Sequence, residues 1–309
     1  MHFPGLYFPV RRIMNYHDFL CSVEADIKTK IPKQWNLNIR PFPKNNGVIY
    51  DGLVITRPNL NISPTVYLNP YYHRYLDGAP LEDIYQDILD TYYRFVPESS
   101  VDLDSLLNFE QVKDCIIMKL IHHDRNSSYL KEVPHLDYLD LAVVFQVYMG
   151  EDKNGFSSIT VTDSLLERWN TDIEKLQALS MRNTPKLLPY KLMNLDVLME
   201  ENNLDMSLPK LEGSDTSMYI LTNNAKVNGA VTILYENLLQ DIAEDLGHDL
   251  ILLPSSIHEF IIVTDPTGNG LSFYNDMVRQ VNEVEVADYE VLSDHAYYYS
   301  LSKKKLFVK

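Results

Sequence analysis

The chain has 309 residues, of which 45% are hydrophobic and 23% are charged, and this composition is typical of a folded globular protein with a substantial core. Its formal net charge of -16 argues against direct binding of nucleic acid, because such proteins gain affinity by replacing counterions with Lys and Arg. The same charge disfavours docking on an anionic membrane, so we expect neither kind of partner.

Asn15 is suited to cap the first helix, whose apolar residues recur at spacings of three and four as far as Ile27. Residues 1–13 lie before it and do not resemble a signal peptide, since their positive charges follow the apolar part. We expect these residues to be a leader that is absent from the native protein, with Met14 as the biological start.

A β-hairpin is predicted next. Two strand-like runs, at 35–42 and 48–56, flank Asn45-Asn46-Gly47, and Asn and Gly accept the positive φ angles of a tight turn. Asp51-Gly52 is a second turn signal, and we interpret it as a bulge within the second strand. An unbroken apolar stripe then predicts a long helix over 81–95. With a buried strand at 112–121, these elements form an expected N-terminal α+β region, residues 14–134.

Residues 135–309 are expected to form a C-terminal α+β domain. Strands are predicted at 139–149 and 159–162, followed by short helices and an acidic loop at 200–217. The last third follows a β-α-β-β-α-β order, with strands at 218–222, 250–254, 257–263 and near 291 and 297–299, and with helices that start at Asn228 or Gly229 and at Leu271. The tight turn between the two central strands makes them antiparallel. The fold class is therefore α+β, with mixed but largely antiparallel sheets and packed amphipathic helices.

Two cysteines, Cys21 and Cys115, each lie in a largely apolar context. Their small number predicts free thiols in a reducing cytoplasm rather than a disulfide framework. No apolar run approaches the roughly 18 residues that a membrane helix needs.

Several segments resemble a bacterial family that is known only as a domain of unknown function, DUF5688. They are Lys44-Asn45-Asn46-Gly47, residues 63–68, 134–141, 218–223 and 229–246, the run Leu253-Pro254-Ser255-Ser256-Ile257-His258-Glu259, and residues 281–283 and 291–294. The resemblance covers nearly the whole chain after Met14. Its members are bacterial, and it implies no activity and no assigned catalytic residues.

The turn between the two apolar C-terminal strands concentrates reactive groups. If the strand geometry persists, Ser256 and His258 point to one face and Glu259 to the other. Ser255 or Ser256 with His258 is then a candidate nucleophile and base, with Asp294 or His295 as a third partner brought by the fold. The alternative is a structural turn whose hydroxyls bond to the backbone. We favour this alternative, because no nucleophile-elbow motif surrounds either serine.

The other candidate ligand groups lack the spacing that metal or cofactor sites need. His258-Glu259 has no second histidine at the zinc-helix spacing. His122-His123-Asp124, with His135, forms an imidazole cluster, but adjacent histidines on a strand face opposite ways and make poor joint ligands. Gly268-Asn269-Gly270 lacks the lysine of a phosphate-binding loop. The sequence therefore predicts no metal and no cofactor.

These observations favour a non-catalytic bacterial interaction or regulatory protein of the cytoplasm, accessory to a mobile element or a stress response, with an unknown protein partner. Two alternatives come from other classes. One is a hydrolase that uses Ser256 and His258. The other is an acidic decoy that imitates nucleic acid, which predicts one continuous stripe of carboxylates.

Overall fold

The computed structural model describes residues 13–98, 100, 102–152, 155–195, 197–198, 217–264 and 270–308. The expected leader apart from Ile13, the acidic loop apart from Ser217, and Gly268-Asn269 lie outside the described residues. The chain divides into two compact units. Unit 1 is Met1–Pro43 with Ile49–Val101, and unit 2 is Lys44–Val48 with Asp102–Lys309.

This division differs from the boundary expected between residues 134 and 135. That boundary falls inside unit 2, between β4 (Ile116–His122) and β5 (His135–Tyr138). Both strands pair with β6 (Leu141–Asp152), one on each side. A single sheet therefore spans the expected boundary, because strand pairing joins segments that sequence order separates.

Unit 1 packs three helices against a three-stranded antiparallel sheet with the order β1-β2-β3. Its elements are α1 (Tyr16–Lys30), β1 (Asn36–Pro43), β2 (Ile49–Thr56), β3 (Thr65–Tyr67), α2 (Asn69–Leu76) and α3 (Leu81–Phe95). The Asn15 side chain accepts a hydrogen bond from the Asp18 amide, which confirms the predicted cap. The apolar faces of α1 and α3 meet the sheet in one buried cluster that includes Phe19, Ile88 and Leu53.

The hairpin prediction is confirmed, whereas the bulge prediction is wrong. Asn46 and Gly47 have φ angles of 61° and 70° in the turn. Gly52 instead continues the regular pairing and faces Arg40. Glycine is needed there because a Cβ atom would lie 2.3 Å from the Cγ2 atom of Thr65 on the neighbouring strand.

Unit 2 contains two antiparallel sheets. In the first, β4 and β5 flank β6, and β7 (Gly155–Thr160) also pairs with β6. The second has the order β13-β12-β10-β11-β9-β8. Its strands are β8 (Tyr190–Asn194), β9 (Met218–Asn223), β10 (Leu250–Ser256), β11 (Glu259–Val263), β12 (Tyr297–Ser300) and β13 (Lys305–Val308). The α+β class is confirmed, and every strand pair among the described residues is antiparallel.

The larger segment of unit 2, Asp102–Lys309, also contains helical segments. They are α4 (Leu103–Leu106), α5 (Phe109–Val112), η2 (Lys113–Cys115), η3 (Asp124–Asn126), η4 (Tyr129–Lys131), α6 (Asp163–Arg168), α7 (Ile173–Leu187), η5 (Gly229–Leu234), α9 (Leu238–Leu246) and α10 (Leu271–Val284). No helix in the described ranges has the length and hydropathy that crossing a bilayer requires.

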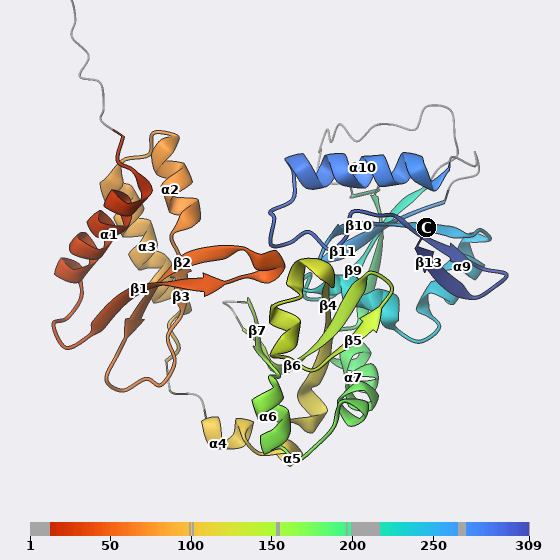
Figure 1. Cartoon of the computed structure of the whole chain (residues 1–309), viewed down its shortest axis with the longest axis horizontal. Coiled ribbons are helices and arrows are strands. Elements are labelled where there is room, and N and C mark those ends of the chain that lie inside the picture. The colour runs from red at the N-terminus through yellow and green to blue at the C-terminus, as the bar shows by residue number, and fades with distance from the viewer. Residues whose placement is uncertain are drawn as a thin grey trace, which may run out of the picture. The chain divides into compact units, whose positions relative to one another are not determined.

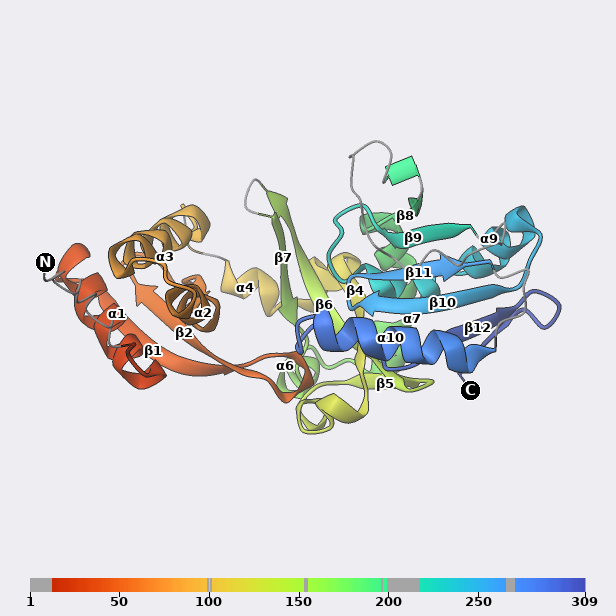
Figure 2. The same ribbon diagram turned by 90° about the horizontal axis from the view of Figure 1, so that it is seen from above.

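Strand β10 is buried on both faces, which explains its unbroken apolar run. Leu250 and Leu252 join the large core that β4, β6 and η5 share, while Ile251 and Leu253 meet Tyr274 and other residues of α10 on the opposite face. Figures 1 and 2 show α10 running across this sheet. The strand that leads into the turn is thus fixed by packing on both of its faces.

The predicted β-α-β-β-α-β order is present with two differences. The first helix is divided into η5 and α9, with Asn237 in the left-handed region at φ 60° between them. The segment near Val291 is not a strand, and the sheet continues from β12 to β13 instead.

Candidate functional site

The turn that carries the reactive side chains lies two residues further along the chain than predicted. Strand β10 continues through Ser256 and β11 begins at Glu259, so Ile257 and His258 form the connection. The pairing shifts between Pro254 and Ser256, which marks an irregularity at this end of the hairpin. His258 therefore lies in a turn, and the alternation of a strand no longer determines where its ring points.

The imidazole ring of His258 is bonded to the backbone of another segment. Its Nδ1 atom accepts a hydrogen bond of 3.1 Å from the amide of Asn228. Because an amide can only donate, Nδ1 carries a lone pair, and the proton of the neutral ring is on Nε2. Nε2 lies 3.6 Å from a carboxylate oxygen of Glu290.

The main chain at this turn is held equally firmly. The carbonyl of His258 accepts from the Thr222 hydroxyl at 2.8 Å. The amide of Ile257 donates to the carbonyl of Glu290 at 2.8 Å. The turn thereby joins three segments that are distant in sequence, namely the end of β9, the start of η5, and the loop before β12.

The hydroxyls of the two candidate serines have other partners. Ser256 uses its hydroxyl oxygen to accept from the amide of His258 at 3.0 Å, as serine does in local turn motifs. The Ser255 hydroxyl donates to Glu259 at 3.4 Å. Neither serine has a hydrogen bond to the His258 ring among the described contacts.

Asp294 and His295 also have other roles. Asp294 forms an ion pair of 2.7 Å with Arg125 and accepts from the Asn282 side chain. The amide of His295 donates to the Ser293 hydroxyl. The carboxylate beside His258 is Glu290, which sequence reasoning missed because it lies 32 positions along the chain in a loop without a motif.

A second unusual titratable group lies on β4. Lys119 is half-buried, and burial, with a smaller contribution from the nearby charge of Lys44, lowers the pKa of its ammonium group from 10.5 to about 8. Protonation of Lys119 is therefore more costly in the folded state than in the unfolded state. A difference of this size corresponds to about 3 kcal/mol.

We expect Lys119→Met to stabilise unit 2 by about 1–3 kcal/mol at pH 7, because methionine keeps the aliphatic stem and removes the desolvated charge. The folded pKa is the lower one, so the native protein gains stability as pH rises from about 8 to 10.5, because in this range the unfolded chain still holds a proton that the native protein has released. The advantage of the variant should shrink across that range. Urea unfolding at pH 7 and at pH 9.5 measures it.

The matched control is Lys191→Met, since Lys191 is exposed on β8. It should change the free energy of unfolding by less than about 0.5 kcal/mol. An equal stability of the Lys119→Met variant and the original protein at pH 7 would contradict the desolvation argument.

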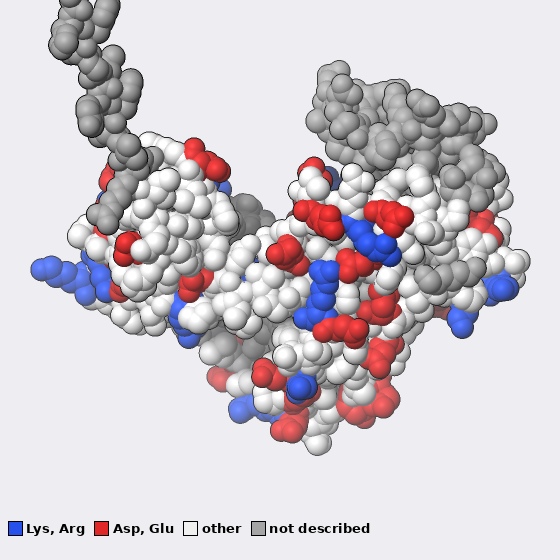
Figure 3. Space-filling view, turned by 45° about the horizontal axis from the view of Figure 1, so that its top comes forward, with Lys and Arg blue, Asp and Glu red and all other residues white. Residues whose placement is uncertain are grey.

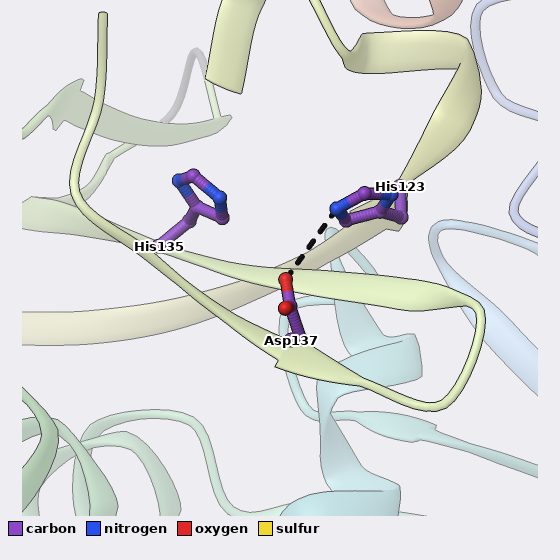
Figure 4. Close-up of side chains that lie close together, drawn as sticks. All are labelled: His123, His135 and Asp137. Carbon is purple, nitrogen blue, oxygen red and sulfur yellow. Dashed lines mark ion pairs between the residues drawn. The ribbon is translucent and has the colours of Figure 1, made fainter. Parts of the chain in front are cut away.

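One group of side chains in the described ranges has the composition of a metal site. His123, His135 and Asp137 can each offer one ligand atom, and these atoms all lie within 4.8 Å of one another. Figure 4 shows the His123 ring facing Asp137, with His135 on the same side of the strand. From the sequence, His123 was grouped with His122, Asp124 and His135 and interpreted as a poor joint ligand, and it was not connected with Asp137.

Comparison with known proteins identifies one family. A model described as a family of unknown function (DUF5688) matches residues 16–301, which is nearly the whole chain. No curated protein and no solved structure matches the chain.

Proposed function

The chain belongs to the family of unknown function DUF5688, and from that premise we propose that it is a non-catalytic interaction or regulatory protein of the bacterial cytoplasm, accessory to a mobile element or a stress response. The observation that carries the proposal is the hydrogen bond from the Asn228 amide to Nδ1 of His258. Through this bond the ring of His258, the most reactive side chain in the run from Leu253 to Glu259, stabilises the fold. A ring that accepts from a buried backbone amide is poorly placed to take a proton from a nucleophile.

The cytoplasmic part of the proposal is supported by the thiols. Cys21 is exposed and Cys115 is partly buried, and both are free. An exposed free thiol suits a reducing compartment.

The charge distribution favours a protein partner over the decoy alternative. Figure 3 shows acidic side chains separated by basic and uncharged ones on the face that it draws. Several carboxylates are also paired within the fold, such as Asp87 with Arg74 and Asp114 with Arg182. A nucleic-acid mimic needs unpaired carboxylates in a continuous array, because its partner reads a line of phosphates.

His258 provides a test that separates structural from catalytic roles. We expect His258→Ala to destabilise unit 2 by about 1–3 kcal/mol, because the Asn228 amide then has no acceptor in a buried position. His258→Asn is the matched variant, since its side-chain oxygen can replace Nδ1 as the acceptor. It should recover most of the lost stability in urea unfolding.

The hydrolase alternative makes the opposite prediction. If the ring acts as a base, both variants must lose any hydrolytic activity, whatever their stability. A broad ester, amide and phosphoester screen of the original protein and the two variants distinguishes the cases. Turnover by the original protein that both variants abolish would overturn the non-catalytic proposal.

The interaction itself is tested in the native bacterium. The tagged chain, expressed from its own promoter, is crosslinked, purified and analysed by quantitative mass spectrometry. We expect one protein to be recovered in a fixed ratio and to bind the purified chain directly. Recovery of nucleic acid in place of a protein would favour the decoy alternative, and a monomeric chain without a direct partner would count against the proposal.

A further inference from the structure

The three side chains in Figure 4 lie on one face of the first sheet of unit 2. Asp137 on β5 and Ile121 on β4 both pair with Ala142 of the central strand β6. Cross-strand partners share a face, and so do residues two apart on one strand. His135 therefore lies on the same face as Asp137. The amide of His123 donates to the Asp140 carbonyl at 3.1 Å and continues the β4–β6 ladder, which places His123 on that face too.

The central strand β6 has a small side chain at this part of the face. Strands are spaced by about 4.8 Å, so side chains on β4 and β5 are separated by about 10 Å at the backbone. Ala142 is the residue between them, and its methyl group is too short to fill the space. His123 and Asp137 can therefore reach over it, and Nε2 of His123 lies 3.4 Å from Oδ1 of Asp137.

The hydrogen bonds of the two rings define where their lone pairs point. Nδ1 of His135 lies 3.0 Å from the carbonyl of Val133, and Nδ1 of His123 lies 2.8 Å from a carboxylate oxygen of Asp124. Both partners can only accept, so each Nδ1 carries a proton. In the neutral rings Nε2 then carries the lone pair. Histidines that bind metals are oriented in the same way, by a carbonyl or carboxylate on the other nitrogen.

The contact between His123 and Asp137 needs a positive charge. A lone pair on Nε2 facing a carboxylate oxygen at 3.4 Å is repulsive unless a proton or a metal ion lies between them. Ligand atoms at about 2.05 Å from a tetrahedral zinc ion are separated by roughly 3.3 Å. The observed distance therefore already matches one edge of a zinc tetrahedron.

We propose that His123, His135 and Asp137 bind a zinc ion, through Nε2 of each histidine and a carboxylate oxygen. Two imidazoles and one carboxylate are a set that suits zinc and related transition metals and suits magnesium or calcium poorly. Asp124 orients His123 and increases the basicity of its ring. Asp137 exposes 76% of its side chain, so solvent or a partner's side chain can supply the fourth ligand.

The alternative to a zinc ion between His123 and Asp137 is a proton. His123 as an imidazolium ion between Asp124 and Asp137 would also satisfy the contacts of its ring. It gives no role to His135, which has no bond to either carboxylate among the described contacts. The two explanations therefore differ in whether His135 and Asp137 affect binding of added zinc.

The test measures zinc affinity by competition with a chromophoric chelator, on the metal-free full chain with Cys21→Ser. That background is needed because Sγ of Cys21 lies 3.7 Å from a ring nitrogen of His17, and together they offer zinc a second set of donors. We expect one equivalent to bind. His135→Ala and Asp137→Asn should each weaken binding at least about 100-fold, and Asp124→Asn should weaken it about 10–100-fold as an outer-shell change.

The matched control is His248→Ala, because His248 is an exposed histidine of the same unit that lies outside the cluster. It should leave zinc affinity unchanged. A readout independent of the chelator is the urea midpoint, which zinc should raise in the control and not in Asp137→Asn. Without metal, the urea midpoints of the Asp137→Asn and Asp124→Asn variants should equal that of the Cys21→Ser chain with the full cluster, because both aspartates are exposed. Equal midpoints exclude misfolding as the cause of lost binding.

Three results would overturn the proposal. The first is the absence of zinc binding by the chain with the full cluster, which would leave the proton as the occupant. The second is a zinc affinity of the His135→Ala and Asp137→Asn variants that equals that of the chain with the full cluster. The third is magnesium binding as tight as zinc binding. Magnesium prefers oxygen ligands, so equal affinity would indicate that carboxylates alone bind the ion, without the two histidines.

Discussion

Replacing Gly229 with alanine is expected to destabilise unit 2 by more than about 4 kcal/mol, or to prevent its folding. A Cβ atom at this position would lie 2.1 Å from the Thr222 hydroxyl oxygen, 2.4 Å from the His258 carbonyl oxygen and 2.8 Å from the Asn223 amide nitrogen. Two of these three atoms belong to the backbone. The clash therefore cannot be relieved by rotating one side chain, and β9 would have to separate from the turn that joins β10 and β11.

The measurement is urea unfolding followed by tryptophan fluorescence. The two tryptophans are Trp35 in unit 1 and Trp169 in unit 2, so a Trp35→Phe background reports on unit 2 alone. Gly270→Ala is the control, because nothing lies within 4 Å of its added Cβ. It should cost at most about 1 kcal/mol, the usual loss at a helix cap. An unchanged midpoint for Gly229→Ala would show that the segments are not packed as described.

Replacing Asp140 with alanine is expected to cost unit 2 about 3–5 kcal/mol. Its carboxylate accepts from the Tyr297 hydroxyl at 2.7 Å and from the Ser293 hydroxyl at 2.6 Å. Tyr297 and Ser293 are both fully buried. Each hydroxyl that loses its acceptor in a buried site costs about 1–3 kcal/mol. The substitution removes both bonds at once and separates the β5–β6 connection from β12.

Tyr297→Phe is the informative comparison. It removes a donor and leaves no buried hydroxyl without an acceptor, so it should cost only about 1 kcal/mol. Asp245→Ala, on the exposed face of α9, should have almost no effect. The same urea titration reports all three variants. A larger loss for Tyr297→Phe than for Asp140→Ala would contradict the argument from unsatisfied hydroxyls.

This network also predicts how stability changes in alkali. Burial, reinforced by the Asp140 carboxylate, raises the pKa of Tyr297 well above its usual value. The folded pKa is the higher one, so its contribution to stability is complete below about pH 10 and is lost as pH rises further. The loss should be smaller in Tyr297→Phe.

Local sequence patterns were sufficient to predict most of the helices and strands. The stripe at 81–95 predicts α3, the cap at Asn15 predicts the start of α1, and the Asn-Gly turn predicts the hairpin, because each depends on residues a few positions apart. The single helix predicted to start at Asn228 or Gly229 is interrupted in its middle, between η5 and α9. The Tyr235 hydroxyl donates to the Leu188 carbonyl at 2.6 Å in the core, a contact that no local pattern reveals and that helps to hold the chain where η5 ends.

By itself the sequence determined the α+β class and most of the C-terminal helices and strands, since short-range periodicity and turn chemistry encode them. Only the tertiary structure decided which groups meet. Nδ1 of His258 accepts from Asn228, 30 residues away, and His123 reaches Asp137 across the small side chain of Ala142. Strand pairing brings these groups together, and pairing between distant segments has no signature in any single stretch of sequence.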